Sequence, residues 1–205
     1  MSARVLLLLS PIAFAIACGH AAPPPTPPAT TSTTASAAPP PPSCESIGAP
    51  CVAGPDTKAR IQHTGYSVAV PSGWKYAQED AATYAETTHA LLVVTTEPVA
   101  SGVDAARASA LARIVERAGV KREKKSAIAF GKKPDKELDV GGLHVVLSQV
   151  NGASHAEAKG ALLLFSTTLP EGSVLVGLGW ADDADDSGAD QAILTAIESI
   201  RGGAK

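Results

Sequence analysis

The sequence contains few aromatic side chains and carries little net charge. Phe, Trp and Tyr make up 4% of its 205 residues, and the formal net charge is −3 at pH 7. So few rings leave little surface on which bases or sugars could stack. So mild a charge does not favour a nucleic-acid partner. Hydrophobic residues reach 45%, which is ample for the core of one domain with appendages.

Short catalytic motifs are lacking as well. The sequence has no G-x-S-x-G nucleophile elbow and no H-E-x-x-H zinc motif. His63, His89, His144 and His155 are scattered, without the i, i+4 spacing of a helical metal site. These absences favour a non-enzymatic binding or accessory module. An enzyme with an unrecognised site stays open as a hypothesis, because scattered residues can converge in space.

The first seventeen residues have the layout of an export signal. Arg4 gives a short positive region, and the apolar run that follows is shorter than the about 20 residues that a membrane-spanning helix needs. The run ends in Ala15-Ile16-Ala17-Cys18, which resembles the bacterial lipobox. The resemblance implies cleavage after Ala17, with residues 1–17 removed, and diacylation of the Cys18 sulfur. It therefore predicts a lipid-anchored protein of the bacterial cell envelope, facing the periplasm or the surface.

Two other interpretations of the N-terminus stay open, namely an ordinary secretory signal cut near Ala21 or Ala22 and an uncleaved membrane anchor. The cysteine count favours lipidation. Assigning Cys18 to the anchor leaves Cys44 and Cys51 as an even pair in an oxidising compartment. Two acyl chains also meet the requirement that stable anchoring needs more than one chain.

A proline-rich linker follows, over residues 18–43. It has no apolar periodicity and few side chains large enough to pack, so we expect disorder with stretches of polyproline II. At about 3.1 Å per extended residue, the linker could hold the domain on the order of 50–75 Å from the membrane. A spacer of selected length and a neutral tether are both compatible with this composition.

Residues 44–59 form a small predicted loop in which Cys44 and Cys51 bracket six residues. A disulfide between them would contribute less than the roughly 3 kcal/mol expected of a fifteen-residue loop. No second pair of cysteines or histidines stands at zinc-ligand spacing, and the spacing is not the C-x-x-C of a redox pair. We expect a structural disulfide at the entrance of the domain.

Residues 60–203 show the patterns of a globular domain. Alternation places Tyr66, Val68 and Val70 on one face of a strand, and Gly141-Gly142 is a two-residue hairpin signal. Further strands are predicted, one beginning at Trp74 and the others at 90–96, 127–130, 138–140, 143–150, 161–168 and 174–181. The glycines at 177 and 179, although they resemble the start of a dinucleotide loop, are interpreted as close-packing positions in a strand.

Two amphipathic helices complete the predicted elements. The first is capped by Ser101 with Asp104 and ended by Gly119, and the second runs from near Asp190 to a stop at Gly202. The buried positions are predicted to be Val103, Ala106, Ala110, Ile114 and Ala118 in the first, and Ile193, Leu194, Ile197 and Ile200 in the second. Adjacent hairpins with two flanking helices define an α+β domain with a mainly antiparallel sheet.

A resemblance to a known fold family rests on two segments. Residues 65–76, GYSVAVPSGWKY, and the closing helix 192–201, AILTAIESIR, resemble the Mog/PsbP-like α/β/α sandwich. The resemblance covers most of residues 60–201. It implies a domain of a kind that is mostly non-catalytic, with a binding or accessory role, and it supplies no catalytic residues to carry over.

An acidic loop precedes the second helix. Asp183, Asp185, Ser187 and Gly188 match the first half of an EF-hand loop, in which alternating oxygens bind Ca²⁺, but Leu194 replaces the final glutamate. One hypothesis is a calcium-binding envelope domain. The alternative is a solvated loop whose charges favour the helix N-terminus, with no cofactor.

A basic connection follows the first helix. Lys121, Arg122, Lys124 and Lys125 begin it, and Lys132, Lys133 and Lys136 continue it. Such a run could contact anionic lipid or an envelope polymer, at about 1 kcal/mol per cation. It could equally be a solvated loop that serves solubility. The sequence names no particular envelope protein or polymer as partner.

Overall fold

The computed structural model describes residues 51–122, 127–184 and 187–203. Cys18, Cys44 and the predicted signal and linker lie outside these residues. Two helices are present in this part of the chain, α1 (Val103–Ala118) and α2 (Ala189–Glu198). The strands are β1 (Lys58–Arg60), β2 (Tyr66–Ala69), β3 (Lys75–Gln78), β4 (Thr83–Glu86), β5 (Ala90–Pro98), β6 (Lys121–Arg122), β7 (Lys136–Val140), β8 (Leu143–His155), β9 (Ala158–Thr168), β10 (Ser173–Asp182) and β11 (Arg201–Gly202).

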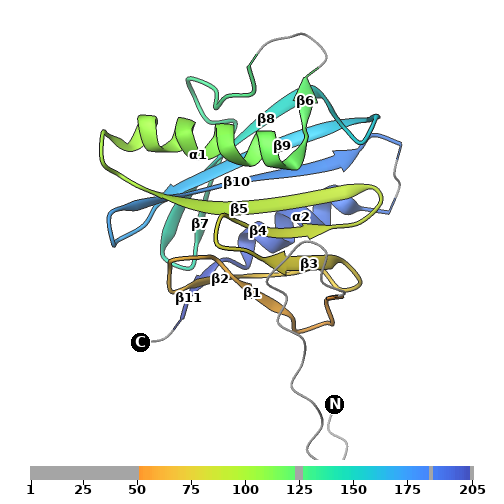
Figure 1. Cartoon of the computed structure of the whole chain (residues 1–205), viewed down its shortest axis with the longest axis horizontal. Helices are drawn as coiled ribbons and strands as arrows, with labels where there is room; N and C mark the ends of the chain where they lie inside the picture. The colour runs from red at the N-terminus through yellow and green to blue at the C-terminus, as the bar shows by residue number, and fades with distance from the viewer. Residues whose placement is uncertain (1–50, 123–126, 185–186, 204–205) are drawn as a thin grey trace, which may run out of the picture. The chain divides into compact units, whose positions relative to one another are not determined.

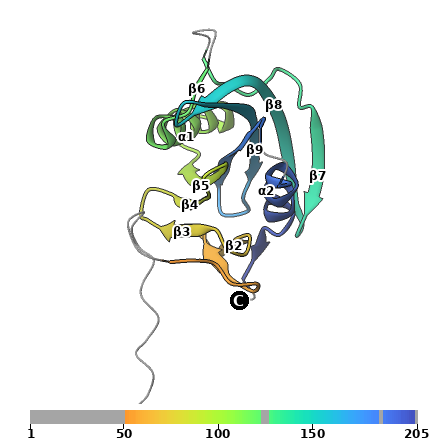
Figure 2. The ribbon, with the colours of Figure 1, turned by 90° about the vertical axis from the view of Figure 1, so that its right-hand side faces the viewer.

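One large sheet dominates the domain (Figure 1). Its strand order is β3-β4-β5-β10-β9-β8-β6, with β7 also pairing with β8, and every pairing is antiparallel. A second sheet joins β1, β2 and β11. The large sheet curls into a half-barrel around α2 (Figure 2). The prediction of an α+β domain with a mainly antiparallel sheet and two helices is confirmed.

The helices lie on opposite faces of the large sheet, and each face has its own core. α1 packs on β5 and β10 over a cluster that includes Leu111, Ile114 and Trp180. α2 packs on the other face, together with the small sheet, over a cluster that includes Trp74 and Ile197. Alternate residues of each central strand serve the two cores, as the period of two requires. Both tryptophans, Trp74 and Trp180, are core residues.

The boundaries of α1 differ in part from those predicted. The capping role of Ser101 was wrong, because the N-cap is Gly102 at φ 108° and no side chain caps the helix. Gly119 ends the helix in the left-handed conformation, as predicted. Four of the five predicted buried positions are buried; Val103 is only partly buried, and Leu111 completes the stripe.

The second helix is shorter than its sequence pattern suggested. It ends at Glu198, and Arg201–Gly202 then pairs with β2 as the edge strand β11. Ile200 is fully buried but lies beyond the helix, whereas Leu194 is only partly buried. Tertiary pairing with β2 therefore overrides the helical periodicity of the last residues.

Most predicted strands are present, and one is not. The Gly141-Gly142 turn joins β7 to β8 with both φ angles positive, as an I′-type hairpin turn requires. Residues 127–130 do not form a strand. The alternation of Ile128 and Phe130 instead reflects packing on the α1 cluster. None of the helices within the described ranges is long and apolar enough to cross a bilayer.

Candidate ligand-binding cavity

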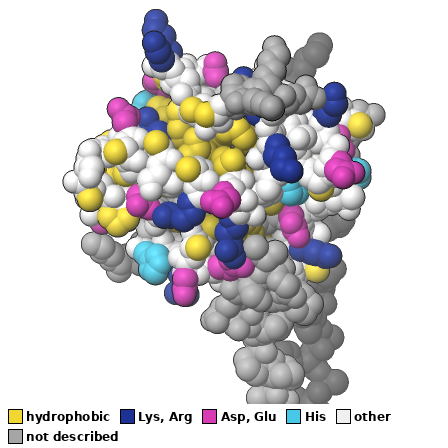
Figure 3. Space-filling view, turned by 45° about the horizontal axis from the view of Figure 1, so that its top comes forward, with side chains coloured by type: hydrophobic (Ala, Val, Ile, Leu, Met, Phe, Trp, Pro, Cys, Tyr) yellow, Lys and Arg dark blue, Asp and Glu magenta, His cyan; other side chains and the backbone are white. Residues whose placement is uncertain are grey.

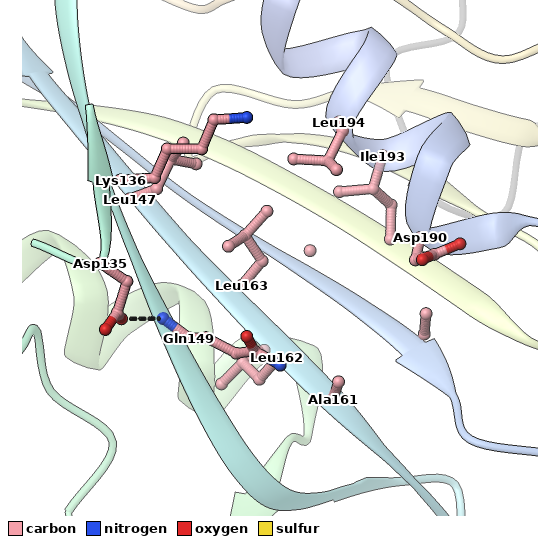
Figure 4. A pocket seen from close by; sticks show the side chains of 12 residues that line it. Asp135, Lys136, Leu147, Gln149, Ala161, Leu162, Leu163, Asp190, Ile193 and Leu194 are labelled. Carbon is pink, nitrogen blue, oxygen red and sulfur yellow. Dashed lines mark hydrogen bonds between the residues drawn. The ribbon is translucent and has the colours of Figure 1, made fainter. Parts of the chain in front are cut away.

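A cavity of about 370 Å³ lies between α2 and the face of the large sheet that curls around it (Figure 4). Its apolar lining comes from aliphatic and small residues of β8, β9, β10 and α2, and its polar lining from the rim. The lining residues are Asp135, Lys136, Leu147, Gln149, Ala161, Leu162, Leu163, Gly179, Ala181, Asp190, Ile193 and Leu194.

Small residues on one strand face create this space. Ala161, Gly179 and Ala181 share the face of β9 and β10 that α2 covers, and antiparallel pairing sets Ala161 directly opposite Ala181. Ile193 of α2 occupies the space above Gly179. The two alanines offer only methyl groups to their side of the layer. The cavity therefore results from small residues at alternate positions of the strands.

Two partly buried leucines mark the apolar walls. Leu163 and Leu194 are both only partly buried although they belong to the sheet and helix layers that enclose the cavity. Figure 4 shows Leu163, Leu194 and Ile193 directed toward one another across the space. Apolar side chains that keep accessible surface in a recess are the usual walls of a ligand site.

The polar groups stand at the rim. The backbone N–H of Gln149 donates a 2.7 Å hydrogen bond to Asp135 Oδ2, which fixes that carboxylate beside the entrance. Lys136 of β7 and Asp190 in the first turn of α2 complete the rim, and both are exposed. The rim therefore offers two carboxylates, one ammonium and one amide, which can orient a ligand whose apolar part enters the cavity.

The described lining of the cavity holds no histidine, cysteine, serine or tyrosine. It thus provides carboxylates and a lysine at the rim but no nucleophile held against a base, the pairing on which covalent catalysis depends.

The acidic loop begins beside this cavity, at the end of β10. Asp182 Oδ1 accepts a 3.0 Å hydrogen bond from the Ala184 N–H, and Asp182 Oδ2 lies 3.2 Å from His89 Nδ1. The Ala184 N–H, followed by the bond from His89, holds the pKa of Asp182 below its usual value. The sequence reasoning missed this partner of His89, because the two residues are far apart in the chain.

The calcium hypothesis stays a prediction. Asp183 and Ser187 are exposed, and Asp185 lies outside the described residues. In the ranges that the structure describes, no three His, Cys, Asp or Glu side chains gather as metal ligands.

The residues of the basic connection lie in different parts of the domain. Lys121 and Arg122 form β6, which pairs with β8, so these two residues belong to a sheet edge rather than to a flexible loop. Lys124 and Lys125 lie outside the described residues. Lys132 lines a recess beside α1, whereas Lys136 is on the rim of the cavity under α2. Contact of Lys121, Arg122, Lys124 and Lys125 with an anionic surface stays a prediction.

Cys51 is buried, with 4% of its surface exposed, and its carbonyl accepts a 3.1 Å hydrogen bond from the Tyr76 N–H. Its predicted disulfide partner, Cys44, lies outside the described part of the chain, and the pairing stays a prediction.

The fold and the cavity place the described domain in the α+β class, with a curled antiparallel sheet that encloses a small site. The sequence matches no protein-family model and no curated protein.

Proposed function

We propose that the chain is an exported bacterial lipoprotein, anchored through acyl groups on Cys18, whose domain is a non-catalytic binding or accessory module. The N-terminal pattern supports the location, since a short apolar run ends in Ala15-Ile16-Ala17-Cys18 and a proline-rich linker follows. The cavity under α2 carries the binding role, because aliphatic walls and a polar rim suit a ligand.

The domain is further proposed to be a Mog/PsbP-like sandwich. A helix on each face of an antiparallel sheet supports this assignment. So does the segment that joins β2 to β3, where Val70 and Trp74 are buried and Gly73 turns the chain at φ 83°. That segment lies within residues 65–76, one of the two segments on which the resemblance rests.

The ligand is proposed to be an apolar group presented by a protein or polymer of the envelope. Such a group would lie against Leu147, Leu163 and Leu194, while polar atoms beside it meet Asp135 and Asp190 at the rim. The linker would let the domain reach that partner at some distance from the membrane.

Photocrosslinking in the native envelope tests this function. A photoreactive leucine analogue replaces Leu194, which lines the cavity, and in a control it replaces Thr195, which is exposed on α2 and outside the lining. The full chain is expressed in its native envelope and irradiated. We expect position 194 to capture an envelope component that position 195 does not.

A second substitution separates binding in the cavity from nonspecific labelling. Ala161→Leu adds side-chain volume at the cavity floor and should abolish the capture at position 194. Equal capture at the two helix positions, or capture that persists in the Ala161→Leu chain, would contradict the cavity as the binding site. Recovery of the chain in the cytosolic fraction would contradict the proposed location.

A further inference from the structure

A second recess lies on the opposite side of the large sheet from the cavity, between α1 and residues 128–132. Its volume is about 400 Å³. Figure 3 shows hydrophobic side chains gathered on the face that includes α1, with side chains of both charge signs around them. The lining residues are Asp104, Arg107, Ala108, Leu111, Ala112, Ile128, Ala129, Phe130, Gly131 and Lys132.

Arg107 differs from the other arginines of α1 in how it is paired. Arg113 forms a 2.7 Å ion pair with Glu97 of β5, and Arg117 pairs with Glu79. Both of those carboxylates are largely buried against the domain. Among the described residues, Arg107 forms its ion pair with Asp104 on its own helix, at 3.3 Å, and the Asp104 side chain is 97% exposed.

An exposed partner of this kind contributes little, because water screens the interaction. Arg107 itself is not comparably exposed, since only 25% of its side-chain surface is accessible. Its Nε is buried and finds no hydrogen-bond partner in the described part of the chain. A buried guanidinium N–H is costly unless an acceptor arrives.

Phe130 places its ring beneath this guanidinium. The Arg107 Cζ lies 5.4 Å from the centroid of the Phe130 ring, within the range of a cation–π contact. Stacking on a ring leaves the in-plane N–H groups of arginine available for a planar acceptor such as a carboxylate.

The charges and walls of the recess limit what it can hold. Arg107 and Lys132 carry two positive charges against the one negative charge of Asp104, so one monoanionic group would balance the recess. The remaining wall is apolar, from Leu111, Ile128, Phe130 and the methyl groups of two alanines.

We propose that this recess binds a small amphiphilic acid, with its carboxylate on the Arg107 guanidinium and its apolar body against Leu111, Ile128 and Phe130. A carboxylate matches the planar fork of arginine and the single unit of excess charge. The cation of this recess, Arg107, is partly buried in a concave site, which suits a free small molecule. A membrane surface is flat and would instead contact exposed lysines.

The test uses the full chain in nanodiscs of phosphatidylcholine, titrated calorimetrically with 4-phenylbutyrate, with empty nanodiscs as the blank. Arg107→Met keeps the aliphatic stem and removes the charge. Arg113→Met removes the same charge from the same helix at an arginine that pairs with Glu97. We expect Arg107→Met to weaken binding at least tenfold and Arg113→Met to change it less than twofold.

Two further comparisons do not depend on the stability of the arginine variants. 4-Phenylbutanol, which lacks only the carboxylate, should bind the unaltered chain at least tenfold more weakly. Ala112→Trp should block the recess, whereas Ala105→Trp, on an exposed position of α1 outside the lining, should not. Equal affinities for the two methionine variants, for the acid and the alcohol, or for the two tryptophan variants would each overturn the proposal. So would an absence of binding by the unaltered chain.

Discussion

Ile193 of α2 packs so closely on Gly179 of β10 that a Cβ at position 179 would overlap with Ile193 Cγ2. Because Gly179 has no side chain, α2 can pack closely on the sheet beside the cavity. Gly179→Ala should therefore lower the free energy of unfolding by about 1–3 kcal/mol, the usual cost of overpacking. Chemical denaturation of the full chain measures this difference.

A matched glycine gives the control for that substitution. No atom would lie within 4 Å of a Cβ at Gly65, and its φ is not in the left-handed region. Gly65→Ala should leave stability within about 0.5 kcal/mol of the unaltered chain. If both alanine variants proved equally stable, the close approach of α2 to β10 would be wrong.

The turn between β8 and β9 uses residues that are poorly suited to it. Ala156 and Glu157 have φ values of 47° and 72°, where a Cβ is strained, and they occupy a two-residue hairpin turn. Replacing them by Asn and Gly should raise the free energy of unfolding by about 1 kcal/mol. A thermal melt of the double variant measures the gain. Glu171→Gly, in a turn where Glu171 has no positive φ, should give no gain.

Tyr84 is buried on the α1 side of the sheet, and the guanidinium of Arg117 lies over its ring. Burial raises the pKa of Tyr84 to about 12 from 10.0, against the opposing charge of Arg117. Near pH 10 the Tyr84 hydroxyl loses its proton in the unfolded chain, whereas in the folded chain it keeps the proton. Stability from this group is therefore complete below pH 10 and falls as the pH rises from 10 to about 12.

Tyr84→Phe should remove that part of the pH dependence. The free energy of unfolding of the unaltered chain should fall relative to the variant between pH 10 and pH 12. The tyrosinate absorbance of the variant should lack the titration step near pH 12 that Tyr84 gives in the unaltered chain. A constant difference between the two chains across this range would show that Tyr84 ionises normally.

Asp182 gives a prediction of opposite sign. Its folded-state pKa lies below 3.8, so the stability from its bonds to Ala184 and His89 is present above that value and lost as the pH falls through the folded pKa. Asp182→Asn should be less stable than the unaltered chain at pH 7, and the difference should shrink below pH 4. A pH-independent cost of Asp182→Asn would contradict the account of this loop.

Local sequence patterns predicted most of the secondary structure. The alternation at Tyr66, Val68 and Val70 and the Gly141-Gly142 turn depend on neighbouring residues, and both were predictable for that reason. The complete small sheet was not, because β11 pairs with β2 across most of the chain, although β1 and β2 are neighbours in sequence. The break after Glu198 depends on the same long-range pairing.

The cavity could not be predicted from the sequence. Its floor consists of small residues at alternate strand positions, Ala161, Gly179 and Ala181, of which only Gly179 was predicted to be a close-packing position. Packing does explain Gly179, which meets Ile193. It does not fill the space at the two alanines, and no periodicity reveals which small residues meet a partner and which face a void.

The location of the protein depends on the fate of Cys18, and one measurement tests it directly. The full-length gene is expressed in its native envelope, and the mature protein is analysed by intact mass and N-terminal peptide mapping. The account predicts a chain that begins at residue 18 and carries a mass increment from acyl groups on that cysteine. A chain that begins near Ala21 or Ala22, or that retains residues 1–17 with an unmodified thiol, would contradict it.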